Sequence, residues 1–400
     1  MNMKVRSVQR VIISAIFLPL VFCVQQACAA KQESAEFQAE LLEIAFETAS
    51  AIPTKPHIKD RSRAQEAVAA ASLALDQPQQ ALEYIEQIGN WRKGLGYGDL
   101  ARYFAQHGSG DAARQYLDLA EEVSESAEDW RRDRIRVKVA QAHALLGQSS
   151  QAEEYEEGVE FAEMGKVAGT MASIAQEEDF EPQMDGLRDL ISKGNFDITR
   201  NALHSCAVLF DRFYKNTEQR GQAEKLIRES WGKMPLFVRI ELLMVLTDAA
   251  LKHSDLSQAF GFVNEAQQLV EGVEWPPEKR MELISRIAEL RFRAGDTENA
   301  KSDMDALLVY YDSEEHRIVN IYKAGALRPL AEAYQAIGET SAALTVYKRA
   351  LESGIENPNS RPQAEDLSAT CVSMALHGVA PDEELWMRIR EIKGSLGEPW

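Results

Sequence analysis

Apolar residues recur along the chain with the spacing of one helix face, and the clearest case lies between residues 327 and 351. A first stripe, with the i, i+3, i+4, i+7 and i+10 spacing of a helix, consists of Leu327, Leu330, Ala331, Tyr334 and Ile337. Gly338 follows and predicts the end of that helix, because glycine tolerates a positive φ. A second stripe consists of Ala343, Leu344, Tyr347, Ala350 and Leu351. Two such helices joined by a tight turn cannot bury their apolar faces alone, so the pattern predicts a hairpin that needs neighbours.

The same register recurs along the chain. Its reference point is the small residue that opens the second helix, with a glycine five positions before it and a large residue four positions after it. The match at Ala113 is complete, with Gly108 in the turn and Leu117 as the large residue. Reference points fall at residues 81, 113, 152, 184, 223, 259, 300, 343 and about 383. They predict an all-α chain of about nine helical hairpins with essentially no strand.

This pattern resembles the tetratricopeptide repeat superfamily, whose signature is an alternation of small and large residues with a glycine in the turn. In the clearest hairpin the residues that carry the resemblance are Leu330, Ala331, Tyr334, Gly338, Ala343, Tyr347 and Ala350. The resemblance implies a right-handed α/α superhelical solenoid whose concave face, lined by first helices, holds a partner protein or peptide. Most of the repeats exceed the common length of about 34 residues, so the superhelical pitch does not follow from the resemblance.

The repeat pattern also predicts the organisation of the chain. A helix over residues 36–50 precedes the first hairpin and is expected to cap it, because a terminal repeat needs a partner for its outer face. We therefore expect a capping helix and linker over residues 30–57, a tetratricopeptide-like solenoid over residues 58–395 and a loose C-terminus over residues 396–400. Four glycines between Gly89 and Gly98 predict a break in the solenoid.

The first 29 residues have the pattern of a cleavable export signal. Three basic residues precede an apolar run over residues 11–24, and Ala27, Cys28 and Ala29 supply a small-x-small cleavage site. The run is shorter than the roughly 20 residues that span a bilayer. We therefore expect a signal peptide cleaved near Ala29 and a periplasmic or secreted bacterial protein. Lipidation of Cys28 stays open as an alternative.

The net charge of the chain limits the kinds of partner that it is expected to bind. With 63 acidic and 44 basic residues, the chain carries a formal charge of −19. Such a charge repels phosphate backbones and anionic lipid head groups, so we expect no nucleic acid and no membrane insertion. Cys206 and Cys371, the cysteines beyond the expected signal, are predicted to be free thiols because they lie four hairpins apart.

The sequence shows no motif for catalysis or cofactor binding. It has no phosphate-binding loop, dinucleotide fingerprint or nucleophile elbow, and its seven histidines are scattered singly. We therefore expect neither enzyme activity, nor a cofactor, nor a metal. The alternatives to a binding scaffold are a carbohydrate-active enzyme built as an α/α toroid and an accessory subunit of an envelope complex.

Two tryptophans, Trp130 and Trp275, each precede a long first helix and are followed by basic residues. We interpret them as packing at junctions between repeats, with the nearby cations paired to the preceding acidic helix. The alternative is that they form a platform for a ligand.

In the tetratricopeptide family, the groove is lined by first-helix residues eighteen and eleven positions before the reference point. The charged residues at these positions include Glu241, and those chosen as candidate binding residues are Arg63, Arg102, Arg134, Lys166, Arg212, Asp248, Glu282, Glu289 and Glu332. The first half of this predicted groove is basic and the second half is acidic. This segregation favours a partner segment with its own acidic and basic ends, oriented by complementary charge. The alternative is that the charges only keep a solvated face soluble, and whether the concave or the convex face binds stays open.

Overall fold

The structure, a computed structural model, describes residues 36–400, so the expected export signal lies outside the described residues. The described residues contain helices and connecting segments and no strand. They form nine helical hairpins, which confirms the prediction of an all-α solenoid.

The first helices of the hairpins are α2 (Thr54–Ala74), α4 (Arg92–Gln106), α6 (Asp129–Leu145), α8 (Lys166–Ile174), α10 (Phe196–Arg212), α12 (Leu236–Lys252), α14 (Pro277–Arg293), α16 (Asn320–Ala336) and α18 (Ser360–Leu376). The second helices are α3 (Pro78–Glu86), α5 (Gly110–Ser126), α7 (Ser149–Glu156), α9 (Phe180–Ser192), α11 (Thr217–Ser230), α13 (Leu256–Glu271), α15 (Thr297–Glu314), α17 (Thr340–Ile355) and α19 (Glu383–Ser395). Short 3-10 turns are η1 (Glu177–Asp179), η2 (Trp231–Lys233) and η3 (Glu315–Arg317).

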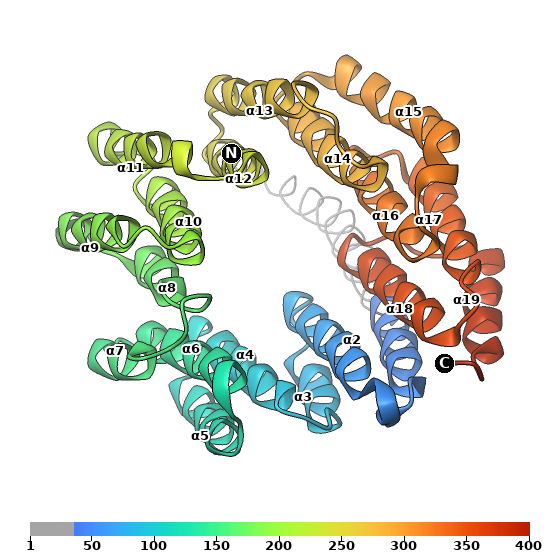
Figure 1. Cartoon of the computed structure of the whole chain (residues 1–400), viewed down its shortest axis with the longest axis horizontal. Helices are drawn as coiled ribbons and strands as arrows, with labels where there is room; N and C mark the ends of the chain where they lie inside the picture. The colour runs from blue at the N-terminus through green and yellow to red at the C-terminus, as the bar shows by residue number, and fades with distance from the viewer. Residues whose placement is uncertain (1–35) are drawn as a thin grey trace, which may run out of the picture.

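The hairpins close into a ring (Figure 1). The first helices form its inner layer, each packed against the next, and the second helices form its outer layer. The last first helix, α18, packs against α2, which completes the inner layer. The sequence predicts a solenoid but not this closure.

A helical segment over residues 36–51, here called the closing helix, joins the two ends of the ring. On one side the ring of Phe46 stacks on Tyr84 of α3 at a centroid distance of 4.2 Å. On the other side Glu40 accepts a hydrogen bond from Arg390 of α19. Leu41 and Leu42 are fully buried in the same hydrophobic core as Met374 and Leu385 of the last hairpin. The segment therefore covers both terminal hairpins, whereas the sequence predicts a cap over the first alone.

Turn residues with a positive φ separate the two helices of most hairpins. Gly108, Gly147, Gly295, Gly338 and Gly378 all adopt this conformation. At the equivalent turns Asp76 and Ser254 adopt it too, with φ of 62° and 61°. The sequence register therefore holds even where glycine is replaced.

The glycine-rich stretch from Gly89 to Gly98 is not a break, and that prediction is wrong. Gly94, Gly96 and Gly98 lie inside α4 and are buried. A Cβ on Gly96 would lie 2.6 Å from Cγ1 of Ile85, and a Cβ on Gly98 would lie 2.6 Å from Cβ of Lys138. These glycines let α4 approach α3 and α6 closely.

Cys206 and Cys371 are buried free thiols, as predicted. The C-terminus differs from the loose end that the sequence predicts. The backbone N–H of Ser360 donates to the carbonyl oxygen of Pro399 at 2.8 Å, and the N–H of Gly397 donates to Oγ of Ser360 at 3.0 Å. The last residues are therefore held against the start of α18.

Candidate partner-binding surfaces

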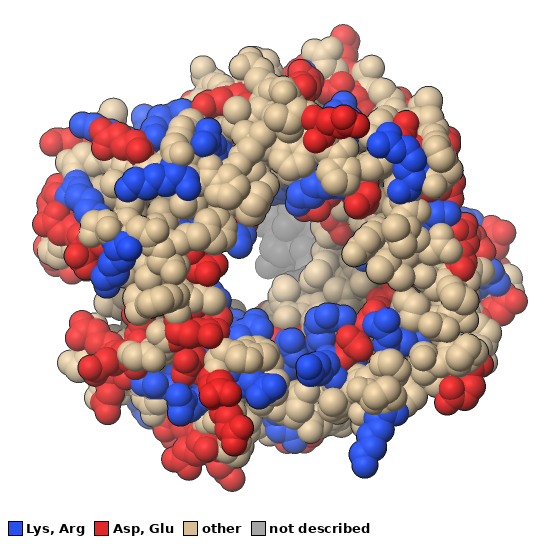
Figure 2. All heavy atoms as spheres, in the orientation of Figure 1, with Lys and Arg blue, Asp and Glu red and all other residues tan. Residues whose placement is uncertain are grey.

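The nine predicted groove residues all lie on first helices, in the inner layer of the ring. The layer surrounds a central opening, and basic side chains gather beside it over α2 and α4 (Figure 2). The predicted groove is therefore the wall of a closed opening rather than an open concave surface.

Each basic member of this set contacts an acceptor within the protein. Arg63 donates to Glu365 at 2.9 Å and to Asp60 at 3.1 Å, and Arg102 donates to Asp99 at 3.0 Å. Glu163 lies 3.7 Å from Arg134 and 2.8 Å from Lys166. Nε of Arg212 donates to the carbonyl oxygen of Ala175 at 2.8 Å.

The acidic members are engaged in the same way. Asp248 pairs with Arg286 and with Arg293, and Glu289 pairs with the same two arginines. Glu282 accepts from Lys279 at 2.8 Å. Oε1 of Glu332 accepts from Oγ of Ser373 at 2.6 Å.

Several ion pairs of the inner layer join neighbouring first helices. Arg63 and Glu365 join α2 to α18, Asp248 and Arg286 join α12 to α14, and Arg328 and Asp366 join α16 to α18. These residues contribute to an inner belt of ion pairs between hairpins. The charges therefore connect parts of the ring, and much of their hydrogen-bonding capacity is used within it.

Within this belt, Glu241 of α12 contacts two residues of α10. Glu241 of α12 accepts two hydrogen bonds from Nη2 of Arg200 on α10, at 2.9 and 3.0 Å, and lies 3.6 Å from His204. Hydrogen bonding from His204, together with Arg200, lowers the pKa of Glu241 to about 2 although partial burial opposes the shift. The ionised carboxylate therefore ties α10 to α12.

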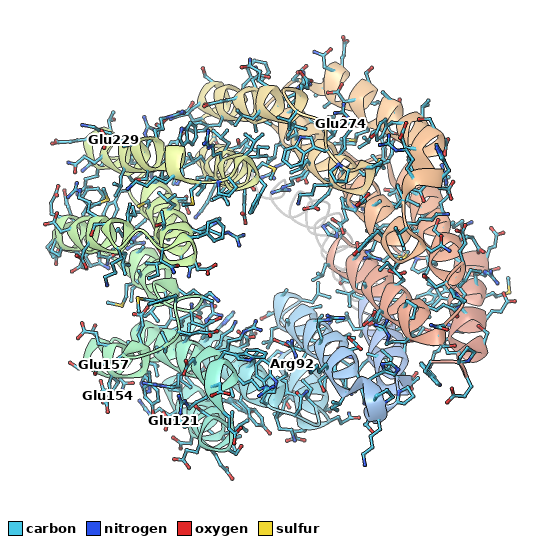
Figure 3. All side chains as sticks on the ribbon, in the orientation of Figure 1. Arg92, Glu121, Glu154, Glu157, Glu229 and Glu274 are labelled. Carbon is cyan, nitrogen blue, oxygen red and sulfur yellow. The ribbon has the colours of Figure 1, made fainter. Side chains whose placement is uncertain are left out.

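A second surface is formed by the N-terminal ends of the first helices and the segments that join one hairpin to the next. We call it the inter-hairpin edge. Figure 3 labels charged side chains along it at three junctions of the ring, Arg92, Glu157 and Glu274. The edge therefore recurs from one junction between hairpins to another.

Exposed apolar side chains gather at this edge. Of the thirteen large apolar residues that are exposed among residues 36–400, eight lie here. They are Trp130, Phe161, Phe196, Phe237, Val273, Val319, Ile321 and Tyr322. Their side chains contribute little to the core of the ring, because each lies outside the stripe that packs between hairpins.

Between α4 and α6 the edge carries a cluster of tryptophan and arginine. The rings of Trp91 and Trp130 meet edge to face at a centroid distance of 5.1 Å. The guanidinium groups of Arg92 and Arg134 lie 4.9 and 5.6 Å from the centroid of the Trp91 ring, and that of Arg131 lies 5.1 Å from the Trp130 ring. Trp130 is 39% exposed, so this junction packing leaves a face of the indole in contact with solvent.

Trp275 matches the packing interpretation more closely. Its Nε1 donates to the carbonyl oxygen of Val270 at 2.9 Å, and the partly buried side chain packs against the hydrophobic core of residues 172–294. Sequence reasoning singled out both tryptophans but missed the phenylalanines and the tyrosine of the edge. Their signal is an aromatic residue at the start of a helix, outside the apolar stripe.

No group of three or more histidine, cysteine, aspartate or glutamate side chains in residues 36–400 is placed to hold a metal ion. No helix in the same range has the length and apolarity to cross a bilayer.

No family model matches the chain, and no curated protein matches it. Two of the solved structures that match the chain align with nearly all of it. One is a circular tandem repeat protein with novel repeat topology and enhanced subunit contact surfaces, at 14% identity and a TM-score of 0.26, covering 92% of this chain and 96% of that one. The other is Ton1535 from Thermococcus onnurineus NA1, at 14% identity and a TM-score of 0.24, covering 94% and 99%. These similarities are too weak to indicate a function. The fold itself defines the chain as a helical repeat protein with the general form of a scaffold.

Proposed function

We propose that the protein is an exported, non-enzymatic scaffold that binds a partner protein at its inter-hairpin edge. The observation that carries the proposal is the concentration of exposed aromatic side chains there. Trp130, Phe196, Phe237 and Tyr322 lie in the first turn of four different first helices, and Phe161 lies in the segment that precedes a fifth, α8. Exposed aromatic side chains that recur from one hairpin to the next offer a partner protein a series of anchor points.

Aromatic anchors suit this role because they bury a large area for few rotatable bonds. Interface residues whose truncation costs the most are enriched in tryptophan, tyrosine and arginine. The cluster of Trp91, Trp130, Arg92 and Arg131 offers this combination at one place on the edge. A partner that covers it would desolvate both the rings and the cations.

The inner wall is a less favourable binding surface. A partner segment could reach the wall of a closed ring only by entering the central opening. Binding to Asp248 or Glu289 would also compete with Arg286 and Arg293, which already neutralise these carboxylates. Replacing Arg102, Arg134 and Arg212 by glutamate would break contacts within the ring, so a loss of binding would not distinguish recognition from folding.

Two sequence features support the wider proposal. The hairpin register resembles the tetratricopeptide repeat superfamily, whose members bind proteins or peptides, and the first 29 residues resemble an export signal. The aromatic residues are spread over five inter-hairpin segments rather than gathered over one pair of carboxylates. This spread favours a broad protein contact over the sugar-binding site of an α/α-toroid enzyme.

Site-specific photocrosslinking in the native host tests the proposal. A photoreactive amino acid at Phe196, Phe237 or Tyr322 should give the same discrete adduct with one partner protein. Matched positions are Val309, which is 69% exposed on α15, and Met387, which is 64% exposed on α19. These apolar positions lie on the outer layer and should give no such adduct.

Serine substitutions provide the second part of the test. Replacing Phe196, Phe237 and Tyr322 together by serine should abolish the adduct from a probe at Trp130 without lowering the melting temperature, since these side chains are exposed. Equal adduct formation at the outer-layer positions, or an unchanged adduct in the triple variant, would rule out the edge as the binding surface.

A further inference from the structure

A pocket of about 360 Å³ lies where α7, α8 and α9 meet. The second helices α7 and α9 stand apart at this place in the outer layer of the ring (Figure 1). With eight residues, α7 is the shortest second helix of the described hairpins, so it leaves part of α8 uncovered. The volume of the pocket lies within the range for small-molecule sites, about 300–1,000 Å³.

The wall of the pocket is largely apolar. It includes Ala152 of α7, Val167, Ala168 and Met171 of α8, and Leu187 and Leu190 of α9. Such a wall suits the methylene groups of a ligand, because the removal of apolar surface from water is favourable.

The charged residues that line the pocket are all acidic, namely Glu153, Glu156 and Asp189. Glu153 is exposed and the side chain of Asp189 is 71% exposed, so these two lie at the mouth, whereas Glu156 is partly buried. Asp189 lies 3.7 Å from the exposed Lys193, but neither glutamate forms an ion pair with any described residue. The pocket therefore carries unbalanced negative charge, which favours a cationic ligand.

Glu156 occupies a position where the repeat register favours a large apolar residue. It is the fourth residue after the reference point at Ala152. In six other hairpins this position holds a large apolar side chain that is at most 2% exposed, and these are Ile85, Leu117, Ile227, Val263, Met304 and Tyr347. A carboxylate therefore lies beside the pocket where these hairpins have core packing. A local departure from the pattern of the fold is typical of a functional site.

The carboxylate of Glu156 is held by the backbone and by no cation. Its Oε1 accepts a hydrogen bond from the N–H of Gly165 at 2.9 Å. Burial raises the pKa of Glu156, although the backbone N–H groups of Gly165 and Val167 oppose the shift. A cation in the pocket would offset the cost of burying this charge.

We propose that the pocket binds a linear aliphatic diamine, with one ammonium group at Glu156 and the other at the mouth beside Glu153 and Asp189. The methylene chain would lie along the apolar wall. Carboxylates at two depths favour a ligand with a cation at each end over one with a single ammonium group. The pocket does not include the exposed aromatic residues of the inter-hairpin edge, so its failure would leave the proposed function unaffected.

Isothermal titration of the purified protein with defined probes tests the site. Cadaverine, a linear diamine, is compared with pentylamine, which lacks the second ammonium group, and with pentane-1,5-diol, which carries no charge. Each is used at up to about 10 mM, since ligands with so few atoms bind weakly. The ionic strength is held constant, because a chain with a formal charge of −19 attracts any cation without a specific site. Cadaverine should bind saturably and more tightly than pentylamine, and the diol should bind least.

Substitutions locate the binding site. Glu156→Gln removes the charge but keeps an acceptor for the N–H of Gly165, and it should weaken cadaverine binding by about tenfold or more, the usual effect of losing a charged hydrogen bond. Glu154→Gln is the matched control, because Glu154 is an exposed residue of the same helix outside the lining of the pocket. It should leave the affinity unchanged.

A second variant tests the mouth of the pocket without touching a buried group. When Glu153→Gln and Asp189→Asn are combined, cadaverine should bind no more tightly than pentylamine.

Three results would overturn the proposal. The absence of saturable cadaverine binding would mean that the pocket takes no diamine. Equal affinities of the Glu156→Gln and Glu154→Gln variants would place the ligand elsewhere. Equal binding of cadaverine and pentylamine to the unmodified protein would indicate a site for a single ammonium group, such as that of a lysine side chain.

Discussion

At the scale of single residues, the turns show how one conformation sets the hairpin. Gly338 has a φ of 84°, and no atom would meet a Cβ at this position within 4 Å. A side chain would therefore be disfavoured by backbone conformation alone and not by crowding. Asp76 and Ser254 adopt the same left-handed conformation at equivalent turns in spite of their Cβ atoms.

We expect Gly338→Ala to lower the free energy of unfolding by about 1–2 kcal/mol, the usual cost of a left-handed conformation for a residue with a Cβ. Gly221→Ala is the matched control. Gly221 lies inside α11 with open space around it, so alanine there should raise the free energy of unfolding by about 0.5–1 kcal/mol. Urea titrations of both variants measure the two values. Effects of the same sign would contradict the assignment of Gly338 to a left-handed turn.

Glycine also shows what a single sequence leaves undetermined at this scale. The turn glycines were predicted correctly because the apolar stripes on both sides fix the register. The sequence wrongly predicts a break at Gly94, Gly96 and Gly98, because a glycine that permits close helix packing cannot be told from one that ends a helix without knowing its neighbours in space. Only the positions of Ile85 and Lys138 in space distinguish the two roles.

At the scale of helices, ion pairs connect several neighbouring first helices around the inner layer, among them α2 and α18, α10 and α12, and α12 and α14. The sequence predicts that these first-helix residues share a wall, but it does not predict the pairs. Arg200 and Glu241 are 41 positions apart, and whether they meet depends on the angle between α10 and α12. Intra-helix periodicity contains no information about that angle.

The contacts of Glu241 on α12 with Arg200 and His204 on α10 predict that the stability of the fold depends on pH. The pKa of Glu241 is lowered from 4.5 to about 2 in the folded protein, so its ionised form is favoured by folding. The resulting stabilisation is complete above pH 4.5 and is lost as the pH falls towards 2. Glu241→Gln should therefore lower the melting temperature at pH 6, and the difference from the unmodified protein should shrink as the pH falls from 4.5 towards 2.

Melting curves across that pH range provide the measurement, with Glu229→Gln as a control on an exposed position of α11. The control should show little difference at any pH. A constant difference for Glu241→Gln down to pH 2 would mean that its carboxylate is not held by His204 and Arg200.

At the scale of the whole molecule, closure of the solenoid into a ring changes which surfaces a partner protein can reach. It turns the predicted concave groove into the wall of an opening and leaves the inter-hairpin edge as the broad surface with exposed aromatic residues. The register predicted the nine hairpins, because each hairpin has its own apolar stripes. It could not predict closure, which depends on the sum of small rotations between hairpins, nor the edge, whose residues lie outside the stripes.

The closing helix offers the most direct test that the molecule is a ring. Lys393 of α19 pairs with Glu47 of the closing helix, 346 positions away. A carbodiimide that joins paired amines and carboxylates should therefore link Lys393 to Glu47 within the monomer at high dilution. Lys348 and Glu384, which pair at 2.7 Å between α17 and α19, provide an internal control that does not depend on closure. Recovery of both linked peptides by mass spectrometry is the expected result. Recovery of the Lys348–Glu384 link without the Lys393–Glu47 link would show that the hairpins form an open solenoid.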